Sequence, residues 1–132
     1  MLAKVNWIEG MTFLGESGSG HNIVMDGNGG DKAPSPMEMV LMAAGGCSSV
    51  DVVAGLKSQQ QCIEKCEAQL TTQRREQAPK LFTQINIHFV ISGQELDEEI
   101  VAQVAKDSLE KYCSVCLMLG SGVEMTHSYE IV

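Results

Sequence analysis

Residues 35–47 read Ser35-Pro36-Met37-Glu38-Met39-Val40-Leu41-Met42-Ala43-Ala44-Gly45-Gly46-Cys47 and open with a strong helix signal. Ser35 suits the N-cap, Pro36 suits the first turn, and Glu38 completes a capping box three residues after the cap. Apolar residues then occupy every face until Asp51, and we expect the helix to end near residues 56–60. A helix that is apolar on all sides is buried on all sides, which a chain this small can hardly achieve alone, so the sequence predicts a dimer.

Segments of alternating polarity on both sides of this helix predict β-strands. We expect strands at residues 2–9, 11–15 and 20–26 before the helix, and at 63–71, 81–91 and 123–132 after it. Asp97, Glu98 and Glu99 mark the start of a second long helix that continues to about residues 112–119. This order predicts an α+β fold in a single domain, residues 1–132, with antiparallel sheets around two long core helices.

Strand residues two apart share a face of the sheet. In the strand at 81–91, the apolar face is therefore expected to hold Leu81, Thr83, Ile85, Ile87, Phe89 and Ile91, with Phe82 on the other face. Cys62 and Cys66 have the same parity and are expected to face the same way.

Composition limits the possible partners and location. The net charge is −8, so we expect no nucleic-acid partner, and no apolar run approaches the length of a membrane span. Residues 1–9 alternate and soon become polar, unlike a secretory signal, which predicts a cytoplasmic location. Five cysteines, an odd number, then favour reduced thiols over a disulfide framework.

No metal or cofactor is expected. The glycine-rich loop at residues 27–33 lacks the spacing of a phosphate-binding loop. A zinc site built from Cys62, Cys66, Cys113 and Cys116 is disfavoured, because a helical setting lacks the turn of a zinc knuckle. The three histidines lie on three different expected strands and are interpreted as strand-face residues.

Cys47 and Cys113 are the candidate reactive groups. A single cysteine in a helix core is usually an inert small apolar residue. Gly45 and Gly46, however, each cost about 1 kcal/mol in a helix interior, which indicates a close approach of a partner helix or a substrate beside Cys47. Glu38 lies on the opposite face of the helix, and Asp51 shares the face of Cys47 but has the wrong charge to activate a thiol.

The stretch at residues 30–47 and the Tyr112-Cys113-Ser114-Val115 segment resemble the OsmC/Ohr family of thiol-dependent peroxidases, in particular its YhfA-like branch. The resemblance spans nearly the whole chain. It implies an intertwined homodimer with both active sites at the interface.

In function, the resemblance implies defence against oxidative stress. Cys47 would be the peroxidatic thiol and Cys113 the resolving thiol, an external dithiol would be the reductant, and organic hydroperoxides or hydrogen peroxide would be the substrates. An apolar pocket lined by Met37, Met42 and Trp7 would suit such substrates, with Glu38 as a further binding residue.

An alternative follows from two departures from the family pattern. The peroxidases of this family carry an arginine upstream of the first cysteine, whereas residues 1–46 contain no arginine and only Lys4 and Lys32 as basic residues. The family's glutamate stands where this chain has Met37, so Glu38 matches it only loosely. The alternative is a non-catalytic small-ligand binder or a redox sensor with the same fold.

Overall fold

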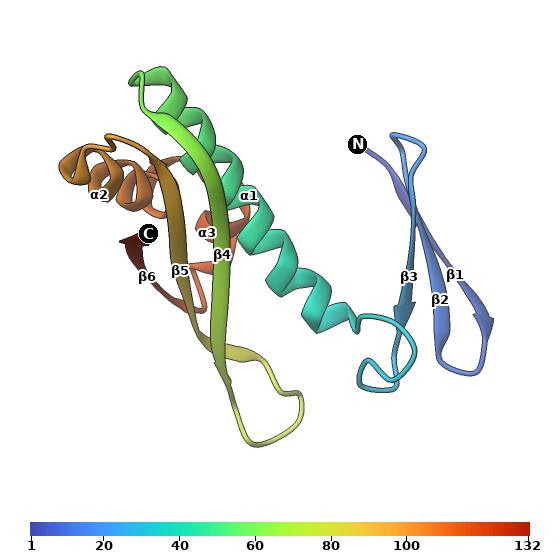
Figure 1. The fold of residues 1–132 in the computed structure, drawn as a ribbon. Coiled ribbons are helices and arrows are strands. Elements are labelled where there is room, and N and C mark those ends of the chain that lie inside the picture. Colours follow the sequence, from blue (N-terminus) through green and yellow to red (C-terminus); the bar gives the residue numbers. More distant parts are fainter. The chain divides into compact units, whose positions relative to one another are not determined.

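The computed structural model describes residues 1–132, which form two compact units, residues 1–42 and residues 43–132. We describe the two units separately. Along the chain the elements are β1 (Ala3–Glu9), β2 (Thr12–Ser17), β3 (Asn22–Asp26), α1 (Pro36–Ser58), β4 (Cys62–Arg74), β5 (Phe82–Gln94), α2 (Glu98–Asp107), the π-helical turn η1 (Ser108–Tyr112), α3 (Ser114–Leu119) and β6 (Glu124–Ile131) (Figure 1).

The first unit is an antiparallel sheet in the order β1-β2-β3. Across the three strands, Phe13 pairs with both Trp7 and Met25. In the next row on the same face, Gly15 pairs with both Val5 and Ile23. These residues share one face, so the sheet has an apolar side. Trp7 and Val5 on that side are 67% and 61% exposed.

Local hydrogen bonds organise the segment between β3 and α1. The buried carboxylate of Asp26 accepts hydrogen bonds from the backbone N–H groups of Asn28 and Lys32, at 2.6 and 2.7 Å. Ser35 N–H donates to Glu38 Oε1 at 3.0 Å, and Glu38 N–H donates to Ser35 Oγ at 3.1 Å. The predicted capping box is therefore confirmed.

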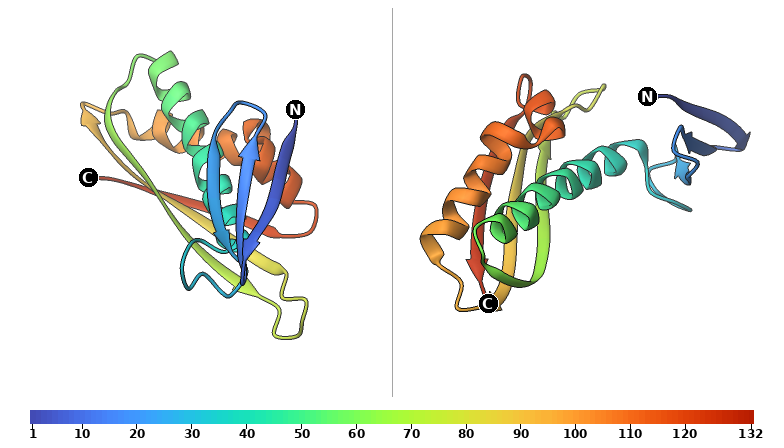
Figure 2. Two further views of the ribbon diagram at one scale, coloured as in Figure 1. Left: turned by 90° about the vertical axis from the view of Figure 1, so that its right-hand side faces the viewer. Right: turned by 90° about the horizontal axis from the view of Figure 1, so that it is seen from above.

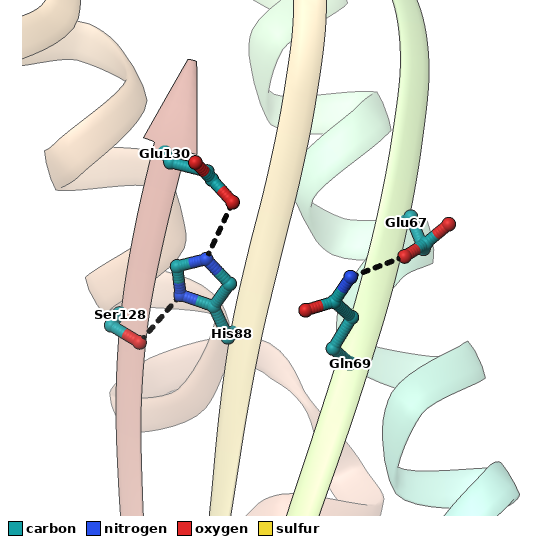
Figure 3. A network of polar contacts seen from close by, with 5 residues as sticks. All are labelled: Glu67, Gln69, His88, Ser128 and Glu130. Atoms are coloured by element: carbon teal, nitrogen blue, oxygen red, sulfur yellow. Dashed lines mark hydrogen bonds and ion pairs between the residues drawn. The ribbon is translucent and has the colours of Figure 1, made fainter. Parts of the chain in front are cut away.

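The second unit is a sheet in the order β4-β5-β6 with helices on one face (Figures 1 and 2). The core beneath the helices includes Ile85, Ile87, Phe89 and Ile91 of β5, all fully buried. On the other face, His88 Nδ1 lies 2.8 Å from Ser128 Oγ and His88 Nε2 lies 3.2 Å from Glu130 Oε1 (Figure 3). Gln69 donates to Glu67 on the same polar face, as Figure 3 also shows.

One strand pairing differs from the prediction. β5 pairs antiparallel with β4 but parallel with β6, so the second sheet is mixed and not antiparallel. Between β5 and β6 the chain passes through α2, η1 and α3, and such a crossover returns a strand in its original direction.

The second long helix was also predicted wrongly. The segment is broken into α2, η1 and α3, because Cys113 adopts an extended conformation with φ −72° and ψ 105°. The N–H group of Cys113 donates to Ser108 O, five residues earlier, at 2.7 Å. The fold therefore has one long core helix, α1. The start of α2 agrees with the prediction, because the Asp97 side chain caps the N–H groups of Glu99 and Ile100.

Two β-bulges changed the expected faces of the strands. A register shift between Gln73 and Arg74 places Phe82 in the core, while Leu81 is 54% exposed and Thr83 is exposed. A second shift between Ile63 and Lys65 leaves Cys62 exposed and Cys66 half-buried, so the two cysteines do not share a face. An extra residue in one strand reverses every face beyond it, which alternation in a single strand does not reveal.

α1 is buried along one face only, contrary to the expectation for the single chain. The buried residues are Ala44, Gly45, Ser48, Val52 and Leu56. Val50, on the opposite side, is 67% exposed, and Met42 at the flank of the buried face is 51% exposed. By length and composition alone α1 could cross a membrane, contrary to the expectation that no segment approaches that length; core helices of soluble proteins pass the same test.

Close packing explains two glycines of α1. A Cβ atom on Gly45 would lie 2.7 Å from Leu70 Cδ1 of β4, and one on Gly55 would lie 2.8 Å from Val104 Cγ1 of α2. The space beside Gly45 is therefore required by a strand, and not by a helix or substrate as expected. A Cβ on Gly46 would meet nothing within 4 Å.

Candidate functional site

A cluster of three functional groups forms in the second unit. The side-chain ligand atoms of Cys47, Asp51 and Cys113 all lie within 4.8 Å of one another. Cys47 and Asp51 are half-buried one turn apart on α1, whereas Cys113 is fully buried between η1 and α3. The fold thus brings together the two cysteines predicted from the sequence, and it adds a carboxylate.

Two buried serines meet where η1 packs against α1, next to this cluster. Ser108 Oγ donates to the carbonyl oxygen of Ser48 at 2.9 Å. Ser48 Oγ in turn donates to Ala44 O at 2.8 Å, with Gly45 O at 3.1 Å. Because Ser48 follows Cys47, the bond from Ser108 ties the two cysteine-bearing segments together, whereas the bonds of the Ser48 hydroxyl stay within α1.

Cys113 is held by the break in the helical segment. Its Sγ accepts a hydrogen bond from the backbone N–H group of Cys116 at 3.3 Å, which makes Cys113 the N-cap of α3. The preceding π-helical turn has one extra residue in its hydrogen-bonded ring, a feature that often marks functional sites. The sequence shows no signal for this break, because neither glycine nor proline is present there.

A third thiol, Cys116, lies beside the pair. It is 1% exposed, and its Sγ donates a weak hydrogen bond to Ala44 O at 3.9 Å. Burial raises the pKa of both Cys116 and Cys113 above the usual cysteine range, and the neighbouring thiols add to the increase for Cys113. No cation counteracts this effect, so burial favours the neutral form of both thiols.

Asp51 is the residue whose role the sequence did not predict. Its Oδ2 atom is buried and has no hydrogen-bond partner. A buried, unpaired carboxylate oxygen is costly, and in native structures such a group calls for an explanation such as a bound ion. The only signal in the sequence was its spacing of four residues from Cys47.

The other predicted site residues belong to the first unit. Trp7 lies on β1 and donates from Nε1 to Gly10 O at 2.8 Å. Met37 is half-buried, and the carboxylate of Glu38 is engaged in the capping box, whose hydrogen bonds lower its pKa. The binding role of these three residues stays a prediction.

Cys62 and Cys66 lie on β4, outside the cluster. Cys62 is exposed. Burial raises the pKa of Cys66, partly opposed by a hydrogen bond with Ser49. No feature of their surroundings suggests that either thiol is reactive.

The fold and the cysteine pair define a class of protein. Residues 29–128 match the family described as OsmC-like protein, and the chain belongs to this family. It is 61% identical to Protein YhfA of Escherichia coli K12 over 132 residues, which cover 100% of this chain and 98% of that protein.

Two solved structures agree with this assignment. One, from structural genomics, has a TM-score of 0.96 and 60% identity and covers 100% of this chain and 98% of its own. The organic hydroperoxide resistance protein OhrB of Bacillus subtilis has a TM-score of 0.64 and covers 98% of both chains. At 18% identity, the second structure supports the fold alone.

Proposed function

We propose that this protein is a thiol-dependent peroxidase that reduces organic hydroperoxides or hydrogen peroxide through Cys47 and Cys113. The observation that supports it best is that the two Sγ atoms lie within 4.8 Å although the two cysteines stand 66 positions apart in the sequence. Membership of the OsmC-like family adds support, since organic hydroperoxide resistance proteins share its fold.

The reaction balances with an external dithiol as the reductant. The Cys47 thiolate attacks a peroxide oxygen, the O–O bond breaks, and the alcohol or water leaves with a proton while Cys47 becomes a sulfenic acid. Cys113 sulfur then attacks Cys47 Sγ, the S–O bond breaks, and water leaves as the disulfide forms. The dithiol returns two electrons and two protons, and is itself oxidised to a disulfide.

We expect the peroxide step to be slow. A reactive thiol needs a nearby cation, a helix N-terminus or hydrogen-bond donors. The charged group beside Cys47 and Cys113 is instead the Asp51 carboxylate. The two arginines are engaged elsewhere, since Arg74 Nε donates to Lys80 O and Arg75 Nε donates to Gln77 O.

The proposal includes a cytoplasmic homodimer. The exposed apolar residues Val5 and Trp7 of β1, and Met42 and Val50 of α1, are of a kind that soluble chains normally cover with a partner. A second copy of the chain would cover them without any further component, as the family resemblance also implies.

The experiment measures the rate at which hydrogen peroxide and cumene hydroperoxide oxidise the reduced protein, followed by peptide mapping. We expect a Cys47–Cys113 disulfide and one molecule of peroxide consumed per chain. The Cys113→Ser/Cys116→Ser double variant removes both neighbouring thiols and should accumulate the sulfenic acid on Cys47. Cys62→Ser, at an exposed position outside the cluster, is the matched control.

A second candidate function is a redox sensor without catalytic turnover. The carboxylate beside Cys47 favours it, since a negative charge slows attack by a thiolate. If peroxide oxidises Cys47 no faster than it oxidises a free thiol in solution, and no turnover follows when dithiol is added, the result would support the sensor and refute the peroxidase.

A further inference from the structure

We propose that Cys47, Asp51 and Cys113 form a binding site for a thiophilic divalent cation, with Zn²⁺ as the best fit. This inference goes beyond the peroxidase proposal and does not depend on it. The donors differ from the four-cysteine zinc site that the sequence disfavours. Cys62 and Cys66 are outside the cluster, and a carboxylate is inside it.

The geometry fits zinc with small side-chain adjustments. Zinc binds cysteine sulfur at about 2.3 Å and carboxylate oxygen at about 2.0–2.2 Å in a tetrahedral arrangement, which places two sulfur ligands about 3.8 Å apart. The three ligand atoms here already lie within 4.8 Å of one another. The hydrogen bond from Ser108 Oγ to Ser48 O ties the two segments together beside this cluster.

The unsatisfied carboxylate gives independent support. Asp51 Oδ2 is buried without a hydrogen-bond partner, although the residue adjoins two thiols that are themselves weak donors. A divalent cation would compensate both the carboxylate and two thiolates, so it turns an unfavourable cluster of acidic groups into a stable one.

The chemistry of the donors selects among metals. Thiolate ligands favour zinc over magnesium or calcium, which require mainly oxygen ligands. Cys116 lies outside the group of three ligand atoms, so three protein ligands would leave the fourth coordination position to water. Three protein ligands with one open position is an arrangement that zinc commonly adopts.

Zinc at this site would compete with oxidation. Coordination occupies both sulfur atoms. Cys47 then cannot attack a peroxide, and Cys113 cannot attack a sulfenic acid. Zinc should therefore slow the oxidation of Cys47, and disulfide formation should release zinc.

The test is a titration of the full-length, fully reduced and metal-free protein with Zn²⁺, in competition with a chromophoric chelator and without peroxide. We expect one zinc ion per chain. Asp51→Asn, Cys47→Ser and Cys113→Ser should each weaken binding at least about tenfold, since even the loss of a group that only hydrogen-bonds to a metal ligand costs about 10–100-fold. Cys62→Ser should bind as the wild type does.

A second measurement uses Co²⁺ as a spectroscopic probe of the same site. Wild type and Cys62→Ser should show the thiolate-to-cobalt charge-transfer band and the intense visible bands of tetrahedral cobalt. Cys47→Ser keeps one thiolate ligand, Cys113, so its charge-transfer band should be weaker. Circular dichroism establishes that each variant is folded. Absence of stoichiometric zinc from the reduced wild type, or unchanged affinity in Asp51→Asn, would overturn the proposal. Because no peroxide is present, either result leaves the peroxidase proposal to its own test.

Discussion

Asp51 connects the two proposals at the level of single residues. One of its carboxylate oxygens lies within 4.8 Å of the Sγ atoms of both Cys47 and Cys113. A negative charge at this place opposes thiolate chemistry but supports metal binding. One isosteric substitution should therefore change the two activities in opposite directions.

We predict that Asp51→Asn accelerates the oxidation of Cys47 by hydrogen peroxide about tenfold in metal-free protein. A tenfold change needs about 1.4 kcal/mol, well below the interaction of about 4 kcal/mol between two unit charges 4 Å apart near a protein surface. Stopped-flow measurement of thiol consumption gives the rate. Glu76→Gln, which removes a charge in an exposed loop, is the control and should react as the wild type. An equal or slower rate in Asp51→Asn would show that the carboxylate does not retard Cys47.

At the level of elements, the capping box makes the start of α1 sensitive to acid. The hydrogen bonds from Ser35 lower the pKa of Glu38 below its ordinary value of 4.5. The unfolded chain keeps the ordinary pKa of Glu38. The ionised carboxylate therefore stabilises the folded protein fully above that pKa, and this stabilisation is lost as the pH falls through the lower pKa of Glu38 in the folded protein.

We predict that Glu38→Gln lowers the melting temperature at neutral pH and that this difference shrinks as the solution is acidified. Melting curves of both proteins across the acid range provide the measurement. Glu76→Gln should show no such difference. A difference that stays constant with pH would mean that the charge of Glu38 does not contribute to the cap.

The contact between Gly55 of α1 and Val104 of α2 allows a double-mutant test of helix packing. We predict that Gly55→Ala destabilises the protein by about 1–2 kcal/mol, because the steric cost of about 1–3 kcal/mol exceeds the gain of up to about 1 kcal/mol from helix propensity. Val104 yields little, since it is 7% exposed and its branched side chain is stiff. Denaturant unfolding gives the values.

The control is the same substitution in a Val104→Ala background, where the clash is removed. There, Gly55→Ala should become neutral or stabilising by up to about 1 kcal/mol. If the cost is the same in both backgrounds, the contact with Val104 is not its cause.

The predictable elements are those fixed by neighbouring residues. The capping box at Ser35 and the helix start at Asp97 depend on side chains within three residues, and the box and the start were both predicted correctly. The break at Cys113, the bulge before Arg74 and the parallel direction of β6 depend on tertiary packing, so periodicity along the chain did not reveal them.

The candidate site follows the same division. The family resemblance indicated Cys47 and Cys113, and the structure brings them together. Asp51 received no role, because its negative charge has the wrong sign to activate a thiol. Its burial arises only when α1 packs within the second unit, and spacing alone contains no information about it.

At the level of the whole molecule, the exposed apolar residues need an explanation. Val5 and Trp7 lie on the apolar face of the first sheet, and Val50 on the exposed side of α1 is 67% exposed. A long helix that exposes such residues to water is unfavourable by about 25 cal/mol for each Å² of apolar surface left uncovered. Dimerisation would remove this cost.

We predict that the wild type sediments as a dimer at micromolar concentration and that Trp7→Glu shifts it toward the monomer, raising the dissociation constant at least about tenfold. A buried interface that loses a large aromatic residue and gains a charge commonly loses more than the 1.4 kcal/mol that a tenfold change requires. Analytical ultracentrifugation without detergent measures the shift. Thr71→Glu places the same charge on an exposed position of β4, an edge strand of the second sheet, and should leave the dimer intact. If the wild type is instead a stable monomer in water, the exposed apolar surface is covered by something other than a second copy, and the homodimer proposal fails.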